Sequence, residues 1–545
     1  MSSEYCQTIE VPEVAYTVPV GGSRDPVNEA IIIENIGTAD VVNPRVTVNG
    51  LYDWSSTERM AAEITRGCTT DEEKAFAIWR WVRGKRFQRS ASDRSSLHPV
   101  RLFNVYGYGI CGHTAAAMKA LGLAAGVPTR VHEIWGHTIS EFFWDDAWHV
   151  LDGNGQVFYP KRDNRTLASV DEVGDDPWIS ERSTLARFTY AYQSKEDNYI
   201  EHSYDEEIET NYAMDMVLRP GEKLIRHWNP TSGKYEGSQG RAEMPSTFAN
   251  GQLIYEPDLR GCDLERDGAF NAAVGGGSPI IGVAKNQDDI FRKFSSWDVR
   301  VQSPYAVVGG RVDVAIMRTG DGRHDSFSVA VMPDGPEGMR REVYSYRYYT
   351  GPREIGLYLD PIVATQTRVG KYGYTLSFYF GAGAGQQAGI DRLKVTTDIQ
   401  VSPHSLPALK QGENAVVYRD ESPEGRQVRI THVWMERAGT PLPSIPADPV
   451  APLNGGRVDS LAPTLAWAPT AGEVDAYHVE VSYRPDCAWP VSSSLDVELP
   501  PSPAEFAVPE SWLNPGTIYY WRVRARDAQG DWGAYSPVWQ FSTPG

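Results

Sequence analysis

Three side chains able to build a nucleophilic centre occur in one stretch of the chain, Tyr106–Asn154: Cys111, His137 and Asp152. A thiol becomes a strong nucleophile when a histidine removes its proton, and an aspartate can fix the tautomer of that histidine. The thiolate then attacks an amide or ester carbonyl and forms a thioester. Water completes a hydrolysis, whereas an amine completes a transamidation. We therefore take these three residues as the candidate catalytic residues.

The cysteine stands where a helix is expected to begin. An alanine-rich run follows it, Ala115–Ala125, and this run ends at Gly126 with Pro128 beyond. Such a pattern is typical of a helix with a glycine stop and a proline barrier. The free N–H groups and the dipole at a helix N-terminus favour an anion, so the pKa of the Cys111 thiol should fall. A cysteine without partners is more often a small buried apolar residue, so the other two side chains decide the interpretation.

The histidine and the aspartate are expected on a β-hairpin. Three segments rich in Val, Ile, Phe and Trp follow the helix: Arg130–Trp135, His137–Trp144 and Ala147–Asp152. Asp145 and Asp146 form a plausible two-residue turn between the last two segments. With that turn, the alternation of side chains places His137 and Asp152 on one face as diagonal neighbours across the hairpin, about 7–8 Å apart at the backbone. A turn of odd length would break this arrangement.

A thioester-forming site also needs donors for the oxyanion of the tetrahedral intermediate. The backbone N–H of Cys111 should supply one donor, which is worth about 3 kcal/mol in such sites. The second donor is expected from Asn104, Tyr106 or Tyr108, which precede the cysteine. The sequence does not choose among the three.

The motifs around these residues resemble the transglutaminase-like superfamily, relatives of papain-type cysteine enzymes. The matching positions are Gly109–Gly112 at the helix start, Gly126–Arg130 at the entry to the sheet, His137, and Trp148–Asp152. The resemblance covers roughly residues 55–185. It implies an α+β core in which Cys111 is the nucleophile, His137 the base and Asp152 its partner. It implies no cofactor and no metal.

Two positions depart from the pattern of that superfamily. Gly153 follows Asp152 where the superfamily usually has proline, and Thr138-Ile139 follow His137 where Ala-Trp is frequent. The three candidate residues are present despite these departures. Because of the departures, the resemblance does not identify the class of substrate.

Composition limits the possible partners. The 545 residues carry a formal net charge of −19, which argues against nucleic acid and anionic membranes as partners. No apolar run is long enough to form a transmembrane segment, and the start, MSSEYCQ, is not typical of a signal peptide. The five cysteines are scattered without CxxC spacing, which argues against a zinc cluster or a dense disulfide framework.

The elements around the site complete a multidomain α+β and all-β protein. Thr70 and Glu73 form a capping box ahead of a helix with an apolar stripe through Trp79. The basic patch Arg83–Arg89 is interpreted as a solvated helix end, and residues 88–105 as a loop leading to Cys111. We expect five parts: a β-module or extension (1–50), the transglutaminase-like core (51–185), a β-rich sandwich region of one or two modules (186–437), a Pro-rich linker (438–452) and a final domain (453–545).

The final part resembles a fibronectin type III domain. The residues that carry the resemblance are Pro463–Trp467, Ala476–Val481, Leu513–Ala525, Trp532–Ser536 and Phe541–Thr543. Leu513 and Tyr519 would form the tyrosine-corner region of the sandwich. Domains of this family are usually spacers or contact modules and are commonest in extracellular bacterial proteins. The resemblance thus favours a secreted or cell-envelope location.

Two functions remain open beside a purely structural adhesion role with an inactive core. The first is a cysteine enzyme, a peptidase, amidase or acyltransferase, acting on a protein, peptide or glycan-linked substrate. The second is a carbohydrate-directed protein, a polysaccharide binder, hydrolase or lyase with a repurposed core. The chain has 16 Trp and 28 Tyr, and Tyr344, Tyr346 and Tyr348 lie on one face of an expected strand, where they could stack on sugar rings. A sandwich surface with cross-strand aromatic pairs is the commoner origin of such a row.

Overall fold

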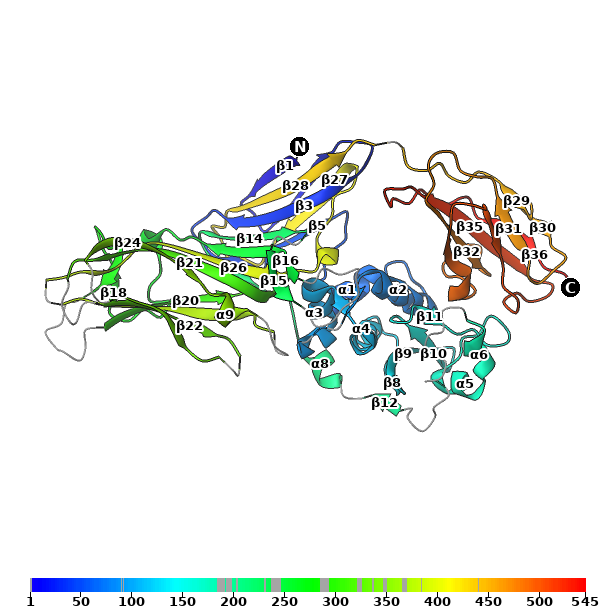
Figure 1. The fold of residues 1–545 in the computed structure, drawn as a ribbon, viewed down its shortest axis with the longest axis horizontal. Coiled ribbons are helices and arrows are strands. Elements are labelled where there is room, and N and C mark those ends of the chain that lie inside the picture. Colours follow the sequence, from blue (N-terminus) through cyan, green and yellow to red (C-terminus); the bar gives the residue numbers. More distant parts are fainter. Residues whose placement is uncertain are drawn as a thin grey trace.

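The structure is a computed structural model. It describes residues 2–89, 91, 93–183, 192, 199–201, 204–229, 232–236, 247–284, 294–320, 326–335, 338–346, 350–364, 370–383, 385–439 and 441–545. Figure 1 shows three regions: a long β-rich region, a helical region with its own sheet, and a β-sandwich at the C-terminal end. The architecture is multidomain and rich in antiparallel sheets, as the sequence predicts.

The helical region places three helices on a five-stranded antiparallel sheet. The helices are α1 (Thr57–Ile64), α2 (Asp71–Gly84) and α4 (Cys111–Ala124). The sheet has the order β11 (Val157–Phe158), β10 (Ala147–Asp152), β9 (His137–Trp144), β8 (Thr129–Ile134) and β12 (Tyr199–Glu201). The predicted capping box of α2 is confirmed, since Thr70 accepts a hydrogen bond from the N–H of Glu73 and the Glu73 side chain accepts one from the N–H of Thr70.

Two glycines, Gly122 and Gly153, lie where helix α4 contacts the sheet, and a side chain at either would clash. A Cβ atom at Gly122 would lie 2.0 Å from Thr129 Oγ1, and one at Gly153 would lie 2.6 Å from Met118 Sδ. Gly153 is the position at which the resembling superfamily usually has proline. Here the absence of a side chain lets the end of β10 pack directly against α4.

Short helical turns occupy the segment that the sequence predicts as a loop. Residues 88–105 contain η1 (Arg94–Leu97), α3 (Pro99–Arg101) and η2 (Leu102–Tyr106), so the expected loop is wrong. Pro99 at the first turn and the His98 side chain, which accepts from the N–H of Val100, start α3. Further along lie α5 (Val170–Asp175), α6 (Pro177–Glu181) and α8 (Asp205–Glu209), while β6 (Phe87–Gln88) pairs in parallel with β7 (Tyr108–Gly109).

The β-rich region has three main sheets. The largest follows the order β1 (Ser2–Ile9), β28 (Val428–Arg437), β3 (Arg24–Asn35), β14 (Glu222–His227), β17 (Gly251–Tyr255), β26 (Ala388–Gln400), β19 (Ile281–Val283) and β18 (Ala272–Val274), with β21 (Ala306–Arg318) joining β26 to β24 (Gly351–Tyr358). A second contains β2 (Glu13–Val20), β27 (Gly412–Arg419) and β5 (Arg45–Val48). A third contains β20 (Phe294–Gln302), β25 (Gly373–Gly381), β22 (Ser326–Pro333) and β23 (Arg341–Tyr346).

The N-terminal strands belong to the same sheets as the strands of residues 412–437. Ile33 of β3 pairs with Ile430 of β28, and Val18 of β2 pairs with Asn414 of β27. The chain therefore starts in the β-rich region, leaves it after β5 to form the helical region, and returns. Local patterns predict these strands but carry no information on partners so distant in sequence, and the domain boundaries themselves stay a prediction. Smaller elements here are β4 (Val41–Val42) with β13 (Val217–Leu218), β15 (Ser232–Glu236) with β16 (Thr247–Ala249), η4 (Leu259–Gly261), α9 (Asp360–Val363) and η5 (Pro403–Ser405).

The C-terminal region is a sandwich of two sheets around its own core. One sheet is β29 (Pro449–Ala451), β31 (Thr464–Trp467) and β34 (Glu505–Ala507). The other is β30 (Gly456–Arg457), β36 (Trp539–Ser542), β35 (Ile518–Arg526), β32 (Ala476–Ser482) and β33 (Asp496–Leu499), and η6 (Ser493–Leu495) precedes β33. The hydroxyl of Tyr519 accepts a hydrogen bond of 2.8 Å from the N–H of Asn514, at the corner where the sequence predicts it.

This sandwich is docked against helix α2. Trp489 of the sandwich is buried in the core of the helical region, where its ring stacks on Phe76 with centroids 4.5 Å apart. Glu480, itself buried, forms an ion pair with Arg80 of α2. The sandwich also contacts the β-rich region, where Nη1 of Arg24 in β3 lies 2.5 Å from Oδ2 of Asp527. The sandwich thus contacts two other regions, and a linker role for residues 438–452 stays a prediction.

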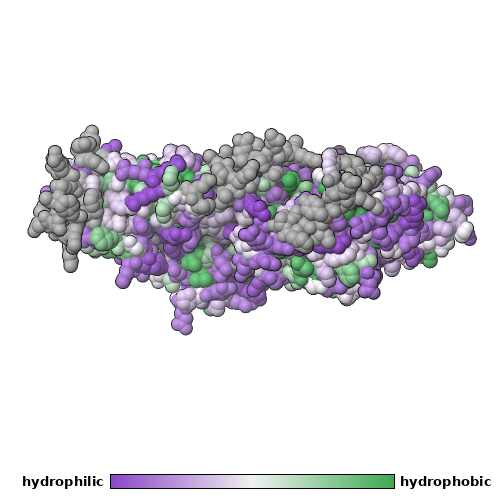
Figure 2. Space-filling model, turned by 90° about the horizontal axis from the view of Figure 1, so that it is seen from below, coloured by the Kyte–Doolittle hydropathy of each residue, from purple (hydrophilic) through white to green (hydrophobic). Residues whose placement is uncertain are grey.

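The coloured part of the surface in Figure 2 is mainly hydrophilic. Hydrophobic residues are scattered among the hydrophilic ones there. Among the described residues, no helix combines the length and the apolar character needed to cross a membrane.

Candidate active site

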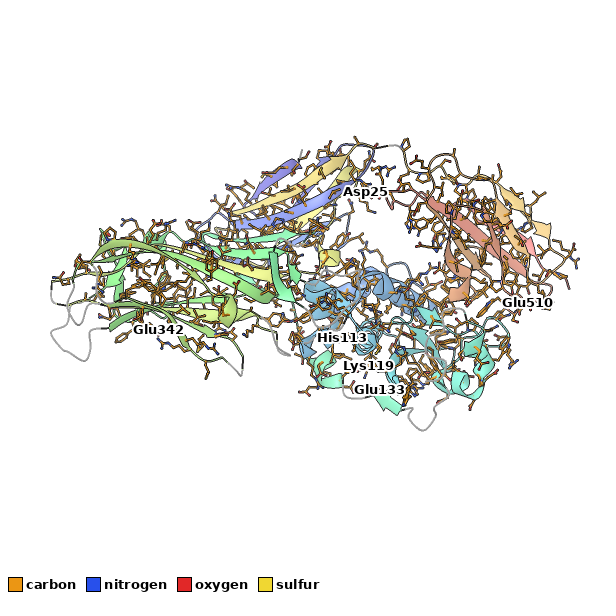
Figure 3. The ribbon with its side chains drawn as sticks, viewed as in Figure 1. Asp25, His113, Lys119, Glu133, Glu342 and Glu510 are labelled. Carbon is orange, nitrogen blue, oxygen red and sulfur yellow. The ribbon has the colours of Figure 1, made fainter. Side chains whose placement is uncertain are left out.

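Cys111 is the first residue of α4, as the sequence predicts. Ile110 has extended backbone angles and forms the N-cap, and its N–H donates to Nδ1 of His113 at 3.4 Å. Figure 3 labels His113 in the first turn of this helix. Cys111 is partly exposed and stands at the end of the helix.

His137 and Asp152 meet across the hairpin in the expected register. Trp144 pairs with Ala147 and Ser140 with Leu151, and both turn residues, Asp145 and Asp146, have positive φ. His137 Nε2 lies 2.7 Å from Asp152 Oδ2.

The aspartate is itself held in place. Its Oδ1 accepts from the N–H groups of Asn154 at 2.9 Å and Gly155 at 2.7 Å. The side chains of His137 and Asp152 are almost completely buried. The carboxylate therefore has one oxygen for the backbone and one for the imidazole.

The charges of these groups support one another. Burial opposes the imidazolium, but the Asp152 carboxylate and the contact with Cys111 outweigh it and raise the pKa of His137 to about 9. Burial likewise opposes the thiolate, but the hydrogen bond with His137 and the N–H groups of Thr138 and Gly112 lower the pKa of the Cys111 thiol below its ordinary value. Nε2 is occupied by Asp152, so Nδ1 is the imidazole nitrogen left to face the sulfur. The arrangement favours a thiolate and an imidazolium side by side.

These pKa shifts predict a bell-shaped pH dependence for the rate of any reaction that needs both the Cys111 thiolate and the protonated imidazole of His137. Alkylation of Cys111 by iodoacetamide should reach half of its plateau at a lower pH than alkylation of a free cysteine thiol, whose pKa is about 8.5. Catalysis by the protonated imidazole should decline as the pH rises through about 9, where His137 loses its proton. Intact-mass measurement of alkylation rates across pH, together with the pH profile of kcat/KM, tests both limbs. An alkylation limb at the pKa of a free thiol would contradict the proposed ion pair.

The side chains of the three oxyanion candidates form hydrogen bonds with other residues. Both amide hydrogens of Asn104 are donated, to the carbonyls of Trp54 at 2.7 Å and Val100 at 3.0 Å. The Tyr106 hydroxyl donates to Asp93 at 2.5 Å, and the Tyr108 hydroxyl accepts from Gln400 at 3.4 Å. These contacts occupy the side chains of Asn104 and Tyr106, and an oxyanion role for any of the three residues stays a prediction.

The sequence did not indicate one group that lies beside the start of α4, the hydroxyl of Tyr204. A Cβ atom on Gly112 would lie 2.6 Å from the hydroxyl of Tyr204, so this hydroxyl lies directly beside the helix start. Tyr204 precedes α8, which an ion pair between Asp205 and Lys119 fastens to α4. No local pattern could indicate Tyr204, because it is far from Cys111 in the sequence.

Helix α2 contacts the end of the strand that carries Asp152. The indole N–H of Trp79 donates to the carbonyl of Asp152 at 3.1 Å. Arg86, just beyond the helix, is buried and not solvated, so the interpretation of Arg83–Arg89 as a solvated helix end is wrong for this residue. The sequence identified the apolar stripe of α2 but not the contact of its indole with the site.

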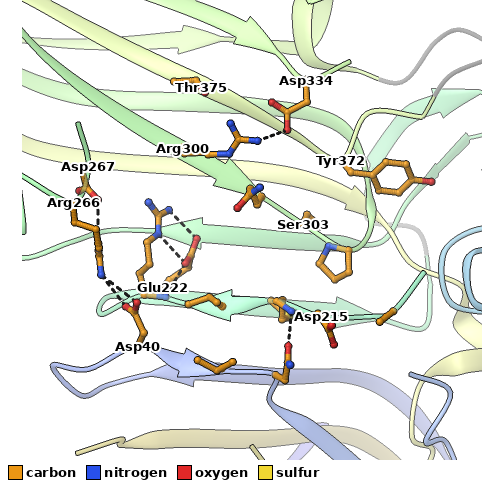
Figure 4. Close-up of a pocket in the computed structure, with 18 of the residues that line it drawn as sticks. Asp40, Asp215, Glu222, Arg266, Asp267, Arg300, Ser303, Asp334, Tyr372 and Thr375 are labelled. Carbon is orange, nitrogen blue, oxygen red and sulfur yellow. Dashed lines mark hydrogen bonds and ion pairs between the residues drawn. The ribbon is translucent and has the colours of Figure 1, made fainter. Parts of the chain in front are cut away.

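A separate polar cavity of about 850 Å³ lies in the β-rich region (Figure 4). Its charged side chains are largely paired with one another: Arg266 with Asp40, Arg219 with Glu222 and Arg300 with Asp334, each at 3.1 Å. Cys111 is not among its lining residues. Of the tyrosine row proposed for sugar stacking, Tyr344 is half-buried, while Tyr348 and the side chain of Tyr346 lie outside the described residues. Neither feature provides a specific reason to assign a glycan site.

Comparison with known families agrees with the two resemblances in part. Residues 58–153 match the model of the transglutaminase-like superfamily. Residues 454–544 match that of the Rha78A-like, N-terminal immunoglobulin domain, so the C-terminal sandwich is immunoglobulin-like. No curated protein matches the chain.

Three solved structures that match the chain are remote likenesses. A β-1,2-glucanase from Parabacteroides distasonis is 10% identical, with a TM-score of 0.15, over 46% of this chain and 31% of its own. The FN1–FN3 domains of chicken CNTN1 are 10% identical, with a TM-score of 0.15, over 45% of this chain and 65% of theirs. Infectious bursal disease virus Gx strain is 8% identical, with a TM-score of 0.20, over 79% of both chains. The chain thus spans less than two thirds of the first two structures, and scores this low carry no conclusion about function.

Proposed function

We propose that this protein is a cysteine-dependent acyl-transfer enzyme of the transglutaminase-like type, acting through a thioester at Cys111. The observation that carries the proposal is the 2.7 Å contact between His137 Nε2 and Asp152 Oδ2 beside a cysteine at a helix N-terminus. In this mechanism His137 takes the thiol proton, and the thiolate attacks the acyl carbonyl. The imidazolium then protonates the leaving amine or alcohol, and water or an amine releases the acyl group.

The developing oxyanion would be met by backbone and hydroxyl donors. The N–H of Cys111 at the first position of α4 has no partner within its own helix and is the natural first donor. The hydroxyl of Tyr204, beside Gly112, is a second candidate because of its position. Exposed apolar side chains lie next to the nucleophile and the base in sequence, Ile110 at 36% and Trp135 at 54% exposure. They favour an acyl donor with an apolar part, such as a peptide or a glycan-linked acyl group.

The location and the nature of the last domain belong to the same proposal. A fibronectin type III identity for the immunoglobulin-like sandwich is supported by the hydrogen bond between Tyr519 and Asn514. Such domains are typical of extracellular proteins, so we place the enzyme in a secreted or cell-envelope setting, with a bulky substrate.

The test is a search for the covalent intermediate. The protein is incubated with a panel of acyl donors, namely glutamine-containing peptides, activated esters and N-acylated sugars, and its intact mass is followed with water or hydroxylamine as acceptor. We expect an acyl adduct on Cys111, released by the acceptor and absent in Cys111→Ser. The matched control is Cys68→Ser, since Cys68 is also partly exposed but burial raises the pKa of its thiol. Turnover that survives Cys111→Ser would contradict the proposal.

A further inference from the structure

One buried arginine connects the two segments that carry the nucleophile and the carboxylate. Arg86 is only 9% exposed. Its Nη1 donates to the carbonyl of Gly109 at 2.9 Å, and its Nη2 donates to the carbonyl of Gly153 at 3.2 Å. Gly109 lies just before Cys111, and Gly153 directly follows Asp152. The planar guanidinium thus joins the backbone on both sides of the candidate site.

Further contacts fix the orientation of this guanidinium. Nη1 also donates to Gln88 Oε1 at 2.7 Å, and Nη2 to Asn154 Oδ1 at 3.2 Å. The N–H of Asn154 donates to Asp152 Oδ1, so one residue contacts both the carboxylate and the guanidinium. A lysine has a single nitrogen at its end and cannot reproduce this fork of contacts.

The charge of Arg86 balances the site. In the active state Cys111 and Asp152 carry one negative charge each and His137 one positive charge, so the three together are left at about −1. An uncompensated buried charge is costly. Arg86 brings the sum to zero. Burial lowers its pKa to about 10 against the pull of Asp152 and Cys111, so it is still charged at neutral pH.

Other ionisable groups also lie around the site, among them the buried Arg89, whose backbone N–H donates to the carbonyl of Gly109 at 3.4 Å. Burial and the charge of Arg86 lower the pKa of His113 to about 4, so this histidine is neutral. Asp93, also buried, accepts from the Tyr106 hydroxyl and faces His113. Tyr159 and Tyr192, beside Asp152, have pKa values raised by burial and stay protonated. The hydroxyl of Tyr204 lies beside Gly112 and is a further polar group near the site.

We propose that Arg86 is a positioning residue of the cysteine centre: it fixes the backbone before Cys111 and after Asp152, and its charge keeps Cys111 in the thiolate form. This inference rests on the proposed function, because it assigns a role within the same site. With this role for Arg86, the segment just after α2 belongs to the site, although the sequence pattern predicted a solvated surface there.

The test compares Arg86→Gln and Arg86→Lys with the native protein by the pH dependence of iodoacetamide alkylation of Cys111. We expect Arg86→Gln to raise the pH at which alkylation of Cys111 reaches half of its plateau. At a pH below that midpoint, alkylation should be about 10-fold slower than in the native protein, since one pKa unit is a factor of ten. Arg86→Lys should keep the limb near that of the native protein and still lower kcat/KM, since it restores the charge without the fork. Arg318→Gln is the matched control, because Arg318 is 1% exposed but lies in β21.

The outcomes separate this inference from the proposed function. If Cys111 of the native protein titrates as an ordinary thiol, the proposed function fails. If the native limb is low and Arg86→Gln leaves it within about twofold in rate, the function stands and the role of Arg86 is overturned. Should Arg86→Gln fail to fold, Arg86→Lys tests the positioning role: a native limb with a lower kcat/KM supports it, and a kcat/KM equal to that of the native protein overturns it.

Discussion

Replacing Asp152 by asparagine is expected to lower kcat/KM for acyl transfer by about 10³- to 10⁴-fold without unfolding the protein. Two backbone N–H groups, those of Asn154 and Gly155, donate to Asp152 Oδ1. They will hold the asparagine oxygen in the same place, which turns the NH₂ group toward His137 Nε2. That nitrogen must then accept a hydrogen bond, so the imidazole proton moves to Nδ1, facing the sulfur. The imidazole can no longer take the thiol proton.

Asp163→Asn is the matched control for this substitution. Asp163 Oδ1 accepts from the N–H groups of Arg165 and Thr166, each at 2.9 Å, in the same local pattern, but no histidine faces it. It should leave kcat/KM unchanged, and both variants should keep the native circular-dichroism spectrum. If Asp152→Asn retained most of the activity, the carboxylate would not control the tautomer, and the proposed mechanism would be wrong.

The part of the site that the sequence predicted is the part formed by short stretches of chain. The start of α4 follows from Ala115–Ala125 and Gly126, and the register of the hairpin follows from the turn at Asp145 and Asp146. Both depend on residues adjacent in sequence, where turn geometry and side-chain alternation act. The contact between His137 and Asp152 therefore follows from the local sequence alone.

The supporting contacts could not be predicted in this way, because their partners are distant in the chain. Tyr204 reaches Gly112, Arg86 reaches Gly153, and Trp489 reaches Phe76 only in the folded protein. The same holds for β1, whose partner strand β28 lies beside it in the sheet but far from it in the sequence. The sequence pattern of Arg83–Arg89 is typical of an exposed helix end. Only the folded protein shows that one of these residues, Arg86, is buried and donates to the carbonyls of Gly109 and Gly153.

Replacing Trp489 by alanine is the second substitution with a large expected effect. It should lower the free energy of unfolding by about 3–5 kcal/mol, as the loss of a large buried aromatic does. It should also lower kcat/KM of the folded protein by about 10- to 100-fold, since small displacements of a catalytic group are costly. Trp489 belongs to the sandwich, yet its ring fills the core of the helical region. Urea unfolding followed by circular dichroism measures the first effect, and steady-state kinetics the second.

The effect on activity follows from the path of contacts through α2. Trp489 stacks on Phe76 with an interplanar angle of 3°, and Glu480 holds Arg80 one turn further along the same helix. Between them Trp79 donates to the carbonyl of Asp152. Loss of the stacked ring lets α2 shift and takes that donor away from the residue that orients His137. Trp532→Ala is the control, because Trp532 lies in the same sandwich near Arg524 and Arg526 and should change stability without changing kcat/KM. If Trp489→Ala also left kcat/KM unchanged, the sandwich would support the fold alone, and the link from α2 to Asp152 would carry no catalytic effect.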